Sequence, residues 1–308
     1  MSIQPEAVTF GLSTQHLPTG DQDDLVPPPT RRSRWSRRRH GRWSEFRFGA
    51  RLGLAVTVVF ILAGLLAPLI APDNPFHLFP QITASPSLQH LLGTDLDGRD
   101  VLSRLIYGST SAYEGVGIAL LVAAIIGIPW GLIAGFGGKV ADEVLMRIAD
   151  IFFSFPALIL SIGIISVLGP SLVHSMLAVG VAFAPSIARL LRSSTLPLRR
   201  ADFVLVASSL GVRRFRIVLR HVLPNAIAPI LVQMFALASV TLIIEAALGF
   251  LSLGAQPPAP SWGNDLATAY TYFLSNPTAT IAPGICITIA AWALGALGDG
   301  LREVFIFG

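Results

Sequence analysis

The chain of 308 residues is long enough for one large domain or two ordinary ones, but its composition excludes a typical soluble protein. Only 13% of the residues are charged, against about 25% in an average soluble protein, and 53% are hydrophobic, so the excess apolar surface requires lipid. The net charge of +4 first suggests nucleic acid or an anionic membrane surface as a partner. Cys286 is the single cysteine, which excludes an intrachain disulfide and a cysteine-based metal site.

Residues 1–45 form a polar, proline-interrupted and then arginine-rich segment that is too poor in apolar residues to build a core. We predict a disordered cytoplasmic tail. Seven arginines between Arg31 and Arg42 directly precede an apolar run, so we interpret them as an anchor on anionic lipid headgroups rather than a nucleic-acid site. A solvated tail without a partner is the remaining alternative.

The remaining residues, 46–308, contain six runs of about 20 mostly apolar residues, the length that a helix needs to cross a hydrocarbon core of about 30 Å. We therefore predict an all-α integral membrane protein with six transmembrane helices. The predicted spans are residues 49–71, 112–136, 147–168, 171–191, 226–253 and 281–304.

The basic residues predict the orientation of these spans, because cytoplasmic flanks retain positive charge. With the N-terminus inside, alternation leaves only Arg99 and Arg104, of 22 basic residues, on the outer side. Both termini are then cytoplasmic. The loops at 72–111 and 254–280 face outward, and the loop at 192–225 faces the cytoplasm.

Small residues and prolines predict features inside two of the spans. Gly127, Gly131 and Gly135 lie four residues apart and would let another helix approach closely. Pro129 and Pro156 interrupt apolar runs and predict kinks.

Motifs for catalysis and for phosphate binding are absent from the sequence. The stretch "GLIAGFGGKV" fails the phosphate-loop pattern at Ile133 and Val140, and neither HExxH nor GxSxG occurs. We therefore predict no enzymatic activity, no bound metal and no cofactor in this chain. Glu245, inside the fifth span, is the clearest intramembrane ionisable group and a candidate for the translocation pathway, with helix packing through a hydrogen bond as the equal alternative.

The loop at 192–225 is predicted to form two short helices joined by a glycine. Asp202 is expected to cap the first helix and Gly211 to end it, and Pro224 is expected to start the next span. The positive-inside rule explains the arginines of this loop, but an apolar helix face must be exposed or covered by a partner. The first helix places Phe203, Val206, Ala207 and Leu210 on one face, and the second places Phe215, Val218, Leu219 and Val222 on one side.

The spacing of Ala207, Gly211, His221, Leu223 and Pro224 is similar to the EAA-loop signature of binding-protein-dependent ABC importer permeases. In that signature, Glu-Ala-Ala is followed by Gly and later by Leu-Pro. This chain has Leu-Val-Ala at residues 205–207, so the Glu is missing and only the last Ala remains.

Two further stretches, residues 91–109 and 253–266, resemble segments of the second permease subunit in dipeptide, oligopeptide and nickel importers. The residues that carry this resemblance are Gly93, Asp95, Gly98, Arg99, Asp100, Arg104, Gln256, Pro257, Pro258, Trp262 and Gly263. We predict that the charges of the first stretch mostly pair with one another and fold the loop, with direct contact to a binding protein as the alternative.

The resemblance implies a type I importer permease fold in the inner or plasma membrane of a prokaryote. It implies a homologous second permease subunit, two ATPase subunits that bind ATP and Mg, and an extracytoplasmic solute-binding protein. Residues 202–211 would form a coupling helix on an ATPase, and Arg213 and Arg214 would pair with acidic residues there. The implied substrate is a di- or oligopeptide, with nickel or another small solute as the alternative. Two alternatives come from other classes of protein. One is a self-contained secondary transporter, and the other is a membrane anchor with a nucleic-acid-binding tail.

Overall fold

We analysed a computed structural model that describes residues 35–307, with side chains described for residues 48–303. The chain divides into two compact units after Arg42, and the second unit, from Trp43 onward, is the one described below. The predicted disordered tail falls largely on residues 1–34, outside the described part, so it stays a prediction.

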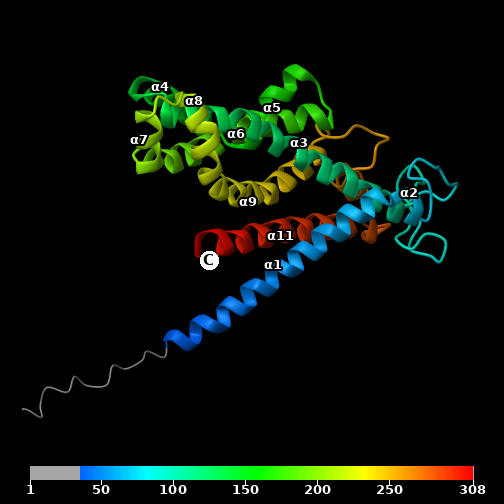
Figure 1. Cartoon of the computed structure of the whole chain (residues 1–308). Helices are drawn as coiled ribbons and strands as arrows, with labels where there is room; N and C mark the ends of the chain where they lie inside the picture. Colours follow the sequence, from blue (N-terminus) through cyan, green and yellow to red (C-terminus); the bar gives the residue numbers. More distant parts are fainter. Residues whose placement is uncertain (1–34, 308) are drawn as a thin grey trace, which may run out of the picture. The chain divides into compact units, whose positions relative to one another are not determined.

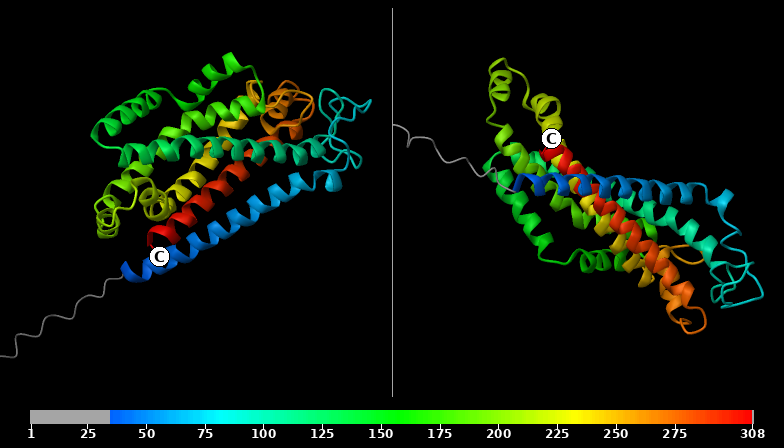
Figure 2. Two further views of the ribbon diagram at one scale, coloured as in Figure 1. Left: turned by 45° about the horizontal axis from the view of Figure 1, so that its top comes forward. Right: turned by 90° about the horizontal axis from the view of Figure 1, so that it is seen from below.

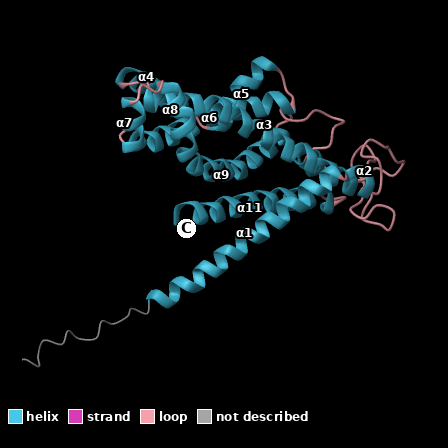
Figure 3. Cartoon of the chain, viewed as in Figure 1, coloured by secondary structure: helices cyan, strands magenta, loops and turns pink. Residues whose placement is uncertain are grey.

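The described residues form helices joined by loops (Figure 3). The helices are α1 (Trp35–Leu65), α2 (Ala67–Ile70), α3 (Val101–Phe136), α4 (Lys139–Phe153), α5 (Ala157–Leu168), α6 (Leu172–Leu198), α7 (Asp202–Ser209), α8 (Arg214–Ile217), α9 (Leu223–Phe250), α10 (Trp262–Tyr270) and α11 (Pro277–Phe307). A π-helical turn, Val218–Val222, joins α8 to α9. The all-α prediction is confirmed.

Five described helices, α1, α3, α6, α9 and α11, include segments long and apolar enough to cross a membrane. These five correspond to five of the six predicted spans. The remaining predicted span, residues 147–168, is broken by a bend of 90° between α4 and α5, and this bent pair gives a sixth span if it crosses the membrane as one unit. The bend lies at the predicted kink. Pro156 explains the break, since proline lacks an N–H and disfavours helical geometry in the residue before it. Pro129, by contrast, lies inside the uninterrupted helix α3.

The contact between α3 and α6 forms the centre of the helix bundle. A Cβ on Gly127 would lie 2.6 Å from the carbonyl oxygen of Ala184, and a Cβ on Gly131 would lie 2.6 Å from that of Ala188. Gly180 of α6 approaches the Ala119 carbonyl of α3 equally closely. The predicted small-residue contact is confirmed, and it brings two backbones together where any side chain would separate them.

Two apolar clusters surround this helix pair. The first joins buried residues of α3, α5, α6 and α9, including Met176 and Ile230. The second joins α3, α9, α10 and α11 around Leu242 and Trp262. Many apolar side chains of α1 are exposed, which suits a lipid-facing helix.

The functional candidates lie at two opposite ends of this bundle (Figure 1). We call residues 199–222, which contain α7 and α8, the α7 end. We call loop 72–100, loop 251–261 and α10 the α10 end. Both views in Figure 2 place the orange segment before α11 beside the cyan loop before α3, so the parts of the α10 end lie together.

Candidate functional site

Helix α7 follows α6 after a short turn and matches the first predicted helix of the loop. The predicted cap at Asp202 is wrong, because Ala201 is the N-cap residue and no side chain caps this helix. The carbonyl of Ala201 accepts from the N–H groups of Val204 and Leu205 and so starts the helix one residue earlier. Asp202 instead occupies the first turn, where its negative charge suits the helix dipole.

Gly211 ends α7 in the left-handed conformation, as predicted, with φ of +76°. The N–H of Gly211 donates to the Ser208 carbonyl, and the N–H of Val212 donates to the Ala207 carbonyl. These two bonds define the Schellman motif. A Cβ at residue 211 would meet nothing within 4 Å, so the backbone conformation alone favours glycine here.

Three apolar side chains of α7 point away from the protein. The exposed fractions are 42% for Phe203, 59% for Val206 and 78% for Leu210. Ala207, which was predicted on the same face, is half-buried and packs with buried Val204 against α8 and the π-helical turn. We call Phe203, Val206 and Leu210 the apolar face of α7. A surface of this kind needs a partner or lipid to cover it.

The second predicted helix of the loop is short and continues into α9 through the π-helical turn. Pro224 explains the wider turn, because it has no N–H to bond the carbonyl four residues earlier. The amide of Asn225 donates to the His221 carbonyl at 2.6 Å, so a side chain satisfies another carbonyl of this turn. The His221 ring lies 6.4 Å from the Phe203 ring, which connects α7 to the start of α9.

The predicted apolar side of this second helix is wrong. Phe215 and Leu219 are exposed, whereas Ile217 and Val222 are buried. The π-helical turn changes the angular phase between these residues, so a 3.6-residue period does not apply across it. Arg213 and Arg214 are exposed, Leu223 is half-buried and Pro224 lies in the first turn of α9.

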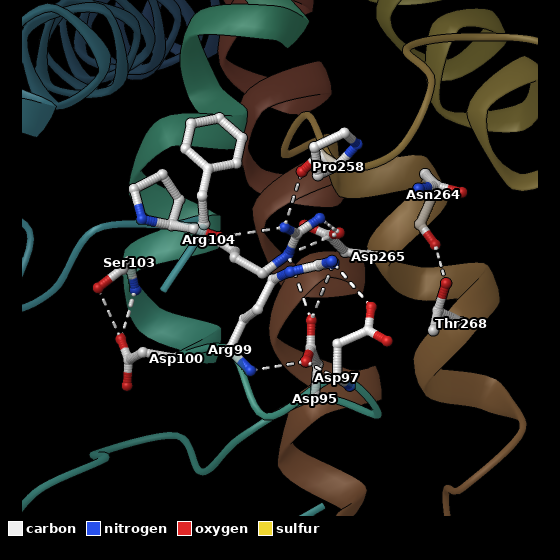
Figure 4. Close-up of polar contacts among 12 residues, drawn as sticks. Asp95, Asp97, Arg99, Asp100, Ser103, Arg104, Pro258, Asn264, Asp265 and Thr268 are labelled. Atoms are coloured by element: carbon white, nitrogen blue, oxygen red, sulfur yellow. Dashed lines mark hydrogen bonds and ion pairs between the residues drawn. The ribbon is translucent and has the colours of Figure 1, made fainter. Parts of the chain in front are cut away.

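At the α10 end, Arg104 is buried and joins three segments of the chain (Figure 4). Its guanidinium donates to the Asp265 carboxylate at 3.1 and 2.5 Å and to the carbonyls of Pro258 at 3.1 Å and Pro75 at 3.4 Å. Asp95 lies 3.7 Å away on the other side. Arginine suits this position because its fixed fork of donors reaches several acceptors at once.

Arg99 forms a second, more exposed ion pair in the same loop. Its guanidinium lies 2.9 Å from Asp97 and 3.8 Å from Asp95 (Figure 4). The prediction that the charges of this loop pair with one another is confirmed. The sequence did not reveal Asp265, which reaches Arg104 from 161 residues along the chain.

Burial shapes the acidity of this cluster. It raises the pKa of the Asp265 carboxyl, and the Arg104 guanidinium opposes that shift. Burial, together with the nearby carboxylates of Asp95 and Asp265, also raises the pKa of the Tyr272 hydroxyl. The cavity beside these groups has a volume of about 60 Å³, far below the several hundred that ligand pockets for small molecules occupy.

Asp100 caps α3 and holds His90. One carboxylate oxygen accepts from the N–H and the hydroxyl of Ser103, both at 2.7 Å, and the other lies 3.0 Å from Nδ1 of His90. Asp73, His90 and Asp100 have potential metal ligands within 4.8 Å of one another. Both oxygens of Asp100 already have partners at a helix N-terminus, where the dipole disfavours a cation. We interpret the group as a helix cap.

Glycines set the turns of loop 72–100. Gly93 and Gly98 have φ of +81° and +78°. A Cβ on either would overlap a backbone carbonyl oxygen, that of Ala84 or that of Phe79. These two positions therefore require glycine for both conformation and space.

The start of α10 is anchored to neighbouring helices, and loop 251–261 is held by bonds within itself. The Trp262 indole donates to the Leu105 carbonyl of α3 at 2.9 Å, and the Gln256 amide donates to the carbonyls of Ser252 and Gly254. Pro257 and Pro258 lie between these anchors. Gly263 lies directly against the backbone of Ala246 in α9.

Glu245 of α9 lies near Ser261, the residue directly before α10, and is 1% exposed. Neither of its carboxylate oxygens has a hydrogen-bond partner among the described residues. The side chain is therefore enclosed within this chain in the present conformation. Its predicted place on the translocation pathway stays a prediction.

A family model described as binding-protein-dependent transport system inner membrane component matches residues 127–307, which is more than half of the chain. The chain belongs to this family. It is a multi-pass protein of the prokaryotic plasma membrane and a non-catalytic component of a transport system.

Curated relatives cover most of the chain. The dipeptide transport system permease protein DppC of Alkalihalophilus pseudofirmus is 37% identical over 82% of this chain and 83% of its own length. The di/tripeptide transport system permease protein DppC of Pseudomonas aeruginosa is 33% identical over 95% and 97%. The glutathione transport system permease protein GsiD of Escherichia coli is 35% identical over 91% and 92%.

A solved structure supports the fold. A chain of the MetNI methionine ABC transporter, in an inward-facing form, superimposes with a TM-score of 0.50 and 23% identity, covering 65% of this chain and 96% of that chain. The predicted type I importer permease fold is confirmed.

Proposed function

We propose that the chain is the permease subunit of an ATP-driven importer for short peptides. The observation that carries the substrate class is the set of relatives, which are named for dipeptides, for di- and tripeptides and for glutathione, itself a tripeptide. A homologous permease subunit would complete the pathway, and an extracytoplasmic binding protein would deliver the peptide.

Coupling to ATP takes place through the apolar face of α7. Phe203, Val206 and Leu210 fit a groove on a separate ATPase subunit, which binds ATP and Mg²⁺. Leu205, which occupies the Glu position of the EAA signature, is also exposed, so it replaces a polar contact with an apolar one. Arg213 and Arg214 lie just beyond Gly211, free to meet acidic residues at the rim of that groove.

Rigid attachment makes α7 suitable for this role. Ala207 and Val204 pack against α8 and the π-helical turn that leads into α9, the Schellman motif fixes the end of α7, and α6 leads into α7 through a three-residue turn. When ATP brings the two ATPases together, a displaced α7 moves α6 and α9 with it. ATP thus favours one conformation of the permease through contacts that differ between conformations.

Copurification in mild detergent tests the coupling. The complex is isolated through a tag on this chain, and the bound ATPase subunit is quantified. We expect Phe203→Asp and Leu210→Asp to abolish retention of the ATPase, because each puts a charge into an apolar contact. Val140→Asp is the matched control, since Val140 is exposed to 77% outside α7.

Loss of the ATPase in the control as well as in the α7 variants would contradict a specific role for α7. Recovery of the wild-type chain as a lone, transport-competent oligomer would instead favour a secondary transporter. Uptake of labelled dipeptide and of nickel by the reconstituted importer with its binding protein distinguishes the two substrate classes.

A further inference from the structure

Helix α10 is joined to its neighbours unequally. Arg104 and the Leu105 carbonyl, both of α3, bond Asp265 and Trp262 of α10. Loop 251–261 adds two bonds, from Ser111 of α3 to the Pro260 carbonyl at 2.9 Å and from Ser175 of α6 to the Leu253 carbonyl at 2.6 Å. Among the described residues, no hydrogen bond or ion pair joins α10 to α9. The polar bonds therefore attach α10 to α3, whereas the loop is bonded to α3, to α6 and, at its start, to the end of α9 through the Leu253 N–H and the Leu248 carbonyl.

The contact between α9 and α10 combines apolar packing around Leu242 and Trp262 with two close backbone approaches. Gly263 lies against the Ala246 carbonyl, and a Cβ on Gly249 would lie 3.2 Å from Cα of Gly263 and 3.3 Å from the Asn264 nitrogen.

Three polar side chains are enclosed at the contact between α9 and the start of α10. Glu245 and Thr241 of α9 and Ser261 before α10 are each at most 1% exposed. Their side-chain oxygens have no hydrogen-bond partner among the described residues, although Ser261 is a near neighbour of Glu245. A buried polar group without a partner destabilises the conformation that encloses it, and a carboxyl does so more than a hydroxyl.

We propose that Glu245 is a positioning residue for alternating access, which weakens the present contact between α9 and α10 so that α10 separates from α9 when the pathway opens at the α10 end. This inference rests on the proposed transport function. In the separated conformation Glu245, Thr241 and Ser261 reach water or new partners, which lowers the free-energy difference between the two conformations. The segment that moves relative to α9 is α10, which its bonds to Arg104 and the Leu105 carbonyl hold on α3.

The proposal predicts an inverse relation between stability and transport. Glu245→Leu fills the same space without polar atoms, so it stabilises the enclosed conformation and lowers the population of the other one. For the full importer in detergent, we expect the melting temperature to rise by about 2–4 °C. Uptake of labelled dipeptide in proteoliposomes with the binding protein is expected to fall about tenfold.

Two further variants make the test specific. Glu245→Gln keeps polar atoms in the enclosed site, so uptake should stay within about threefold of wild type. Thr241→Val removes an unpartnered hydroxyl at nearly constant shape, so the melting temperature should rise and uptake fall, each by less than in Glu245→Leu. If Glu245→Leu fails to assemble, Thr241→Val decides by the same two measurements.

Lower melting temperatures in both apolar variants would overturn the proposal, because the polar group would then support the contact. A higher melting temperature with unchanged uptake would also overturn it. Failure of the proposed function looks different, since it appears in the wild-type importer as absent ATPase or absent peptide uptake before any variant is made.

Discussion

The α7 end and the α10 end differ in which side chains they expose and which they enclose. The α7 end leaves apolar side chains exposed, whereas the α10 end encloses charged ones around Arg104. An exposed apolar face is completed by another molecule, and an enclosed ion pair is already complete within the chain. The comparison teaches that contacts within the permease stabilise the α10 end, whereas the apolar face of α7 is open to a partner.

Breaking the Arg104 pair should produce the largest loss of stability. Arg104→Met leaves Asp265 buried without its cation, which costs about 3–5 kcal/mol and should lower the melting temperature of the complex strongly. Asp97→Asn, in the exposed pair with Arg99, is the control, with an expected cost of about 0–1 kcal/mol.

The double variant Arg104→Met with Asp265→Leu sharpens this prediction. Replacing both partners of a buried pair by apolar residues is often nearly neutral, so it should recover much of the lost stability. A double variant as unstable as the single one would mean that the carbonyl contacts of Arg104 matter more than its charge.

Separating α3 from α6 should have the next largest effect. Gly131→Ala places a Cβ against the Ala188 carbonyl and should cost about 1–3 kcal/mol, measured as a lower melting temperature. Gly117 lies in the same helix with nothing within 4 Å of a Cβ, so Gly117→Ala should be neutral or stabilise by about 0.5–1 kcal/mol. Equal effects at the two positions would contradict a close backbone contact.

At the α7 end, Gly211→Ala should cost about 1 kcal/mol, because a side chain disfavours the left-handed conformation even in open space. Gly211→Asn should cost less, since asparagine tolerates this conformation better. The measurement is the melting temperature together with the fraction of ATPase retained. A large loss in Gly211→Ala with normal stability would place residue 211 itself in the ATPase contact.

The smallest effect on stability is expected from Phe203→Ser. Phe203 is 42% exposed, so the permease alone should change by no more than about 0.5 kcal/mol, while retention of the ATPase falls sharply. A marked fall in the melting temperature of the permease without its ATPase would contradict the contrast between the two ends.

Local signals made much of the fold and of the α7 end predictable. Hydropathy over 20 residues identified five spans, and the position of Gly211 identified the end of α7, because both properties depend on near neighbours in the sequence. The bend at Pro156 was expected as a kink, but its angle of 90° depends on how α4 and α5 pack.

Long-range contacts explain what the sequence did not reveal. Asp265 meets Arg104 through the packing of α10 on α3, and no spacing rule connects positions 161 residues apart. Ala207 was assigned to the exposed face by helical periodicity alone, whereas α8 and the π-helical turn partly cover it. The π-helical turn before α9 shifted the buried side of the arginine segment, since it departs from the period that the prediction assumed.

The close backbone contact between α3 and α6 joins these two helices into one rigid unit. Helix α3 has 36 residues, or about 54 Å at 1.5 Å per residue, and it begins at Val101, three residues before Arg104. Helix α6 leads into α7 through a three-residue turn. A displacement of α6 is therefore expected to move α3 with it, and with α3 the attached Arg104 and α10. In this permease the glycines between α3 and α6 are the residues on which joint movement of the two ends of the bundle depends.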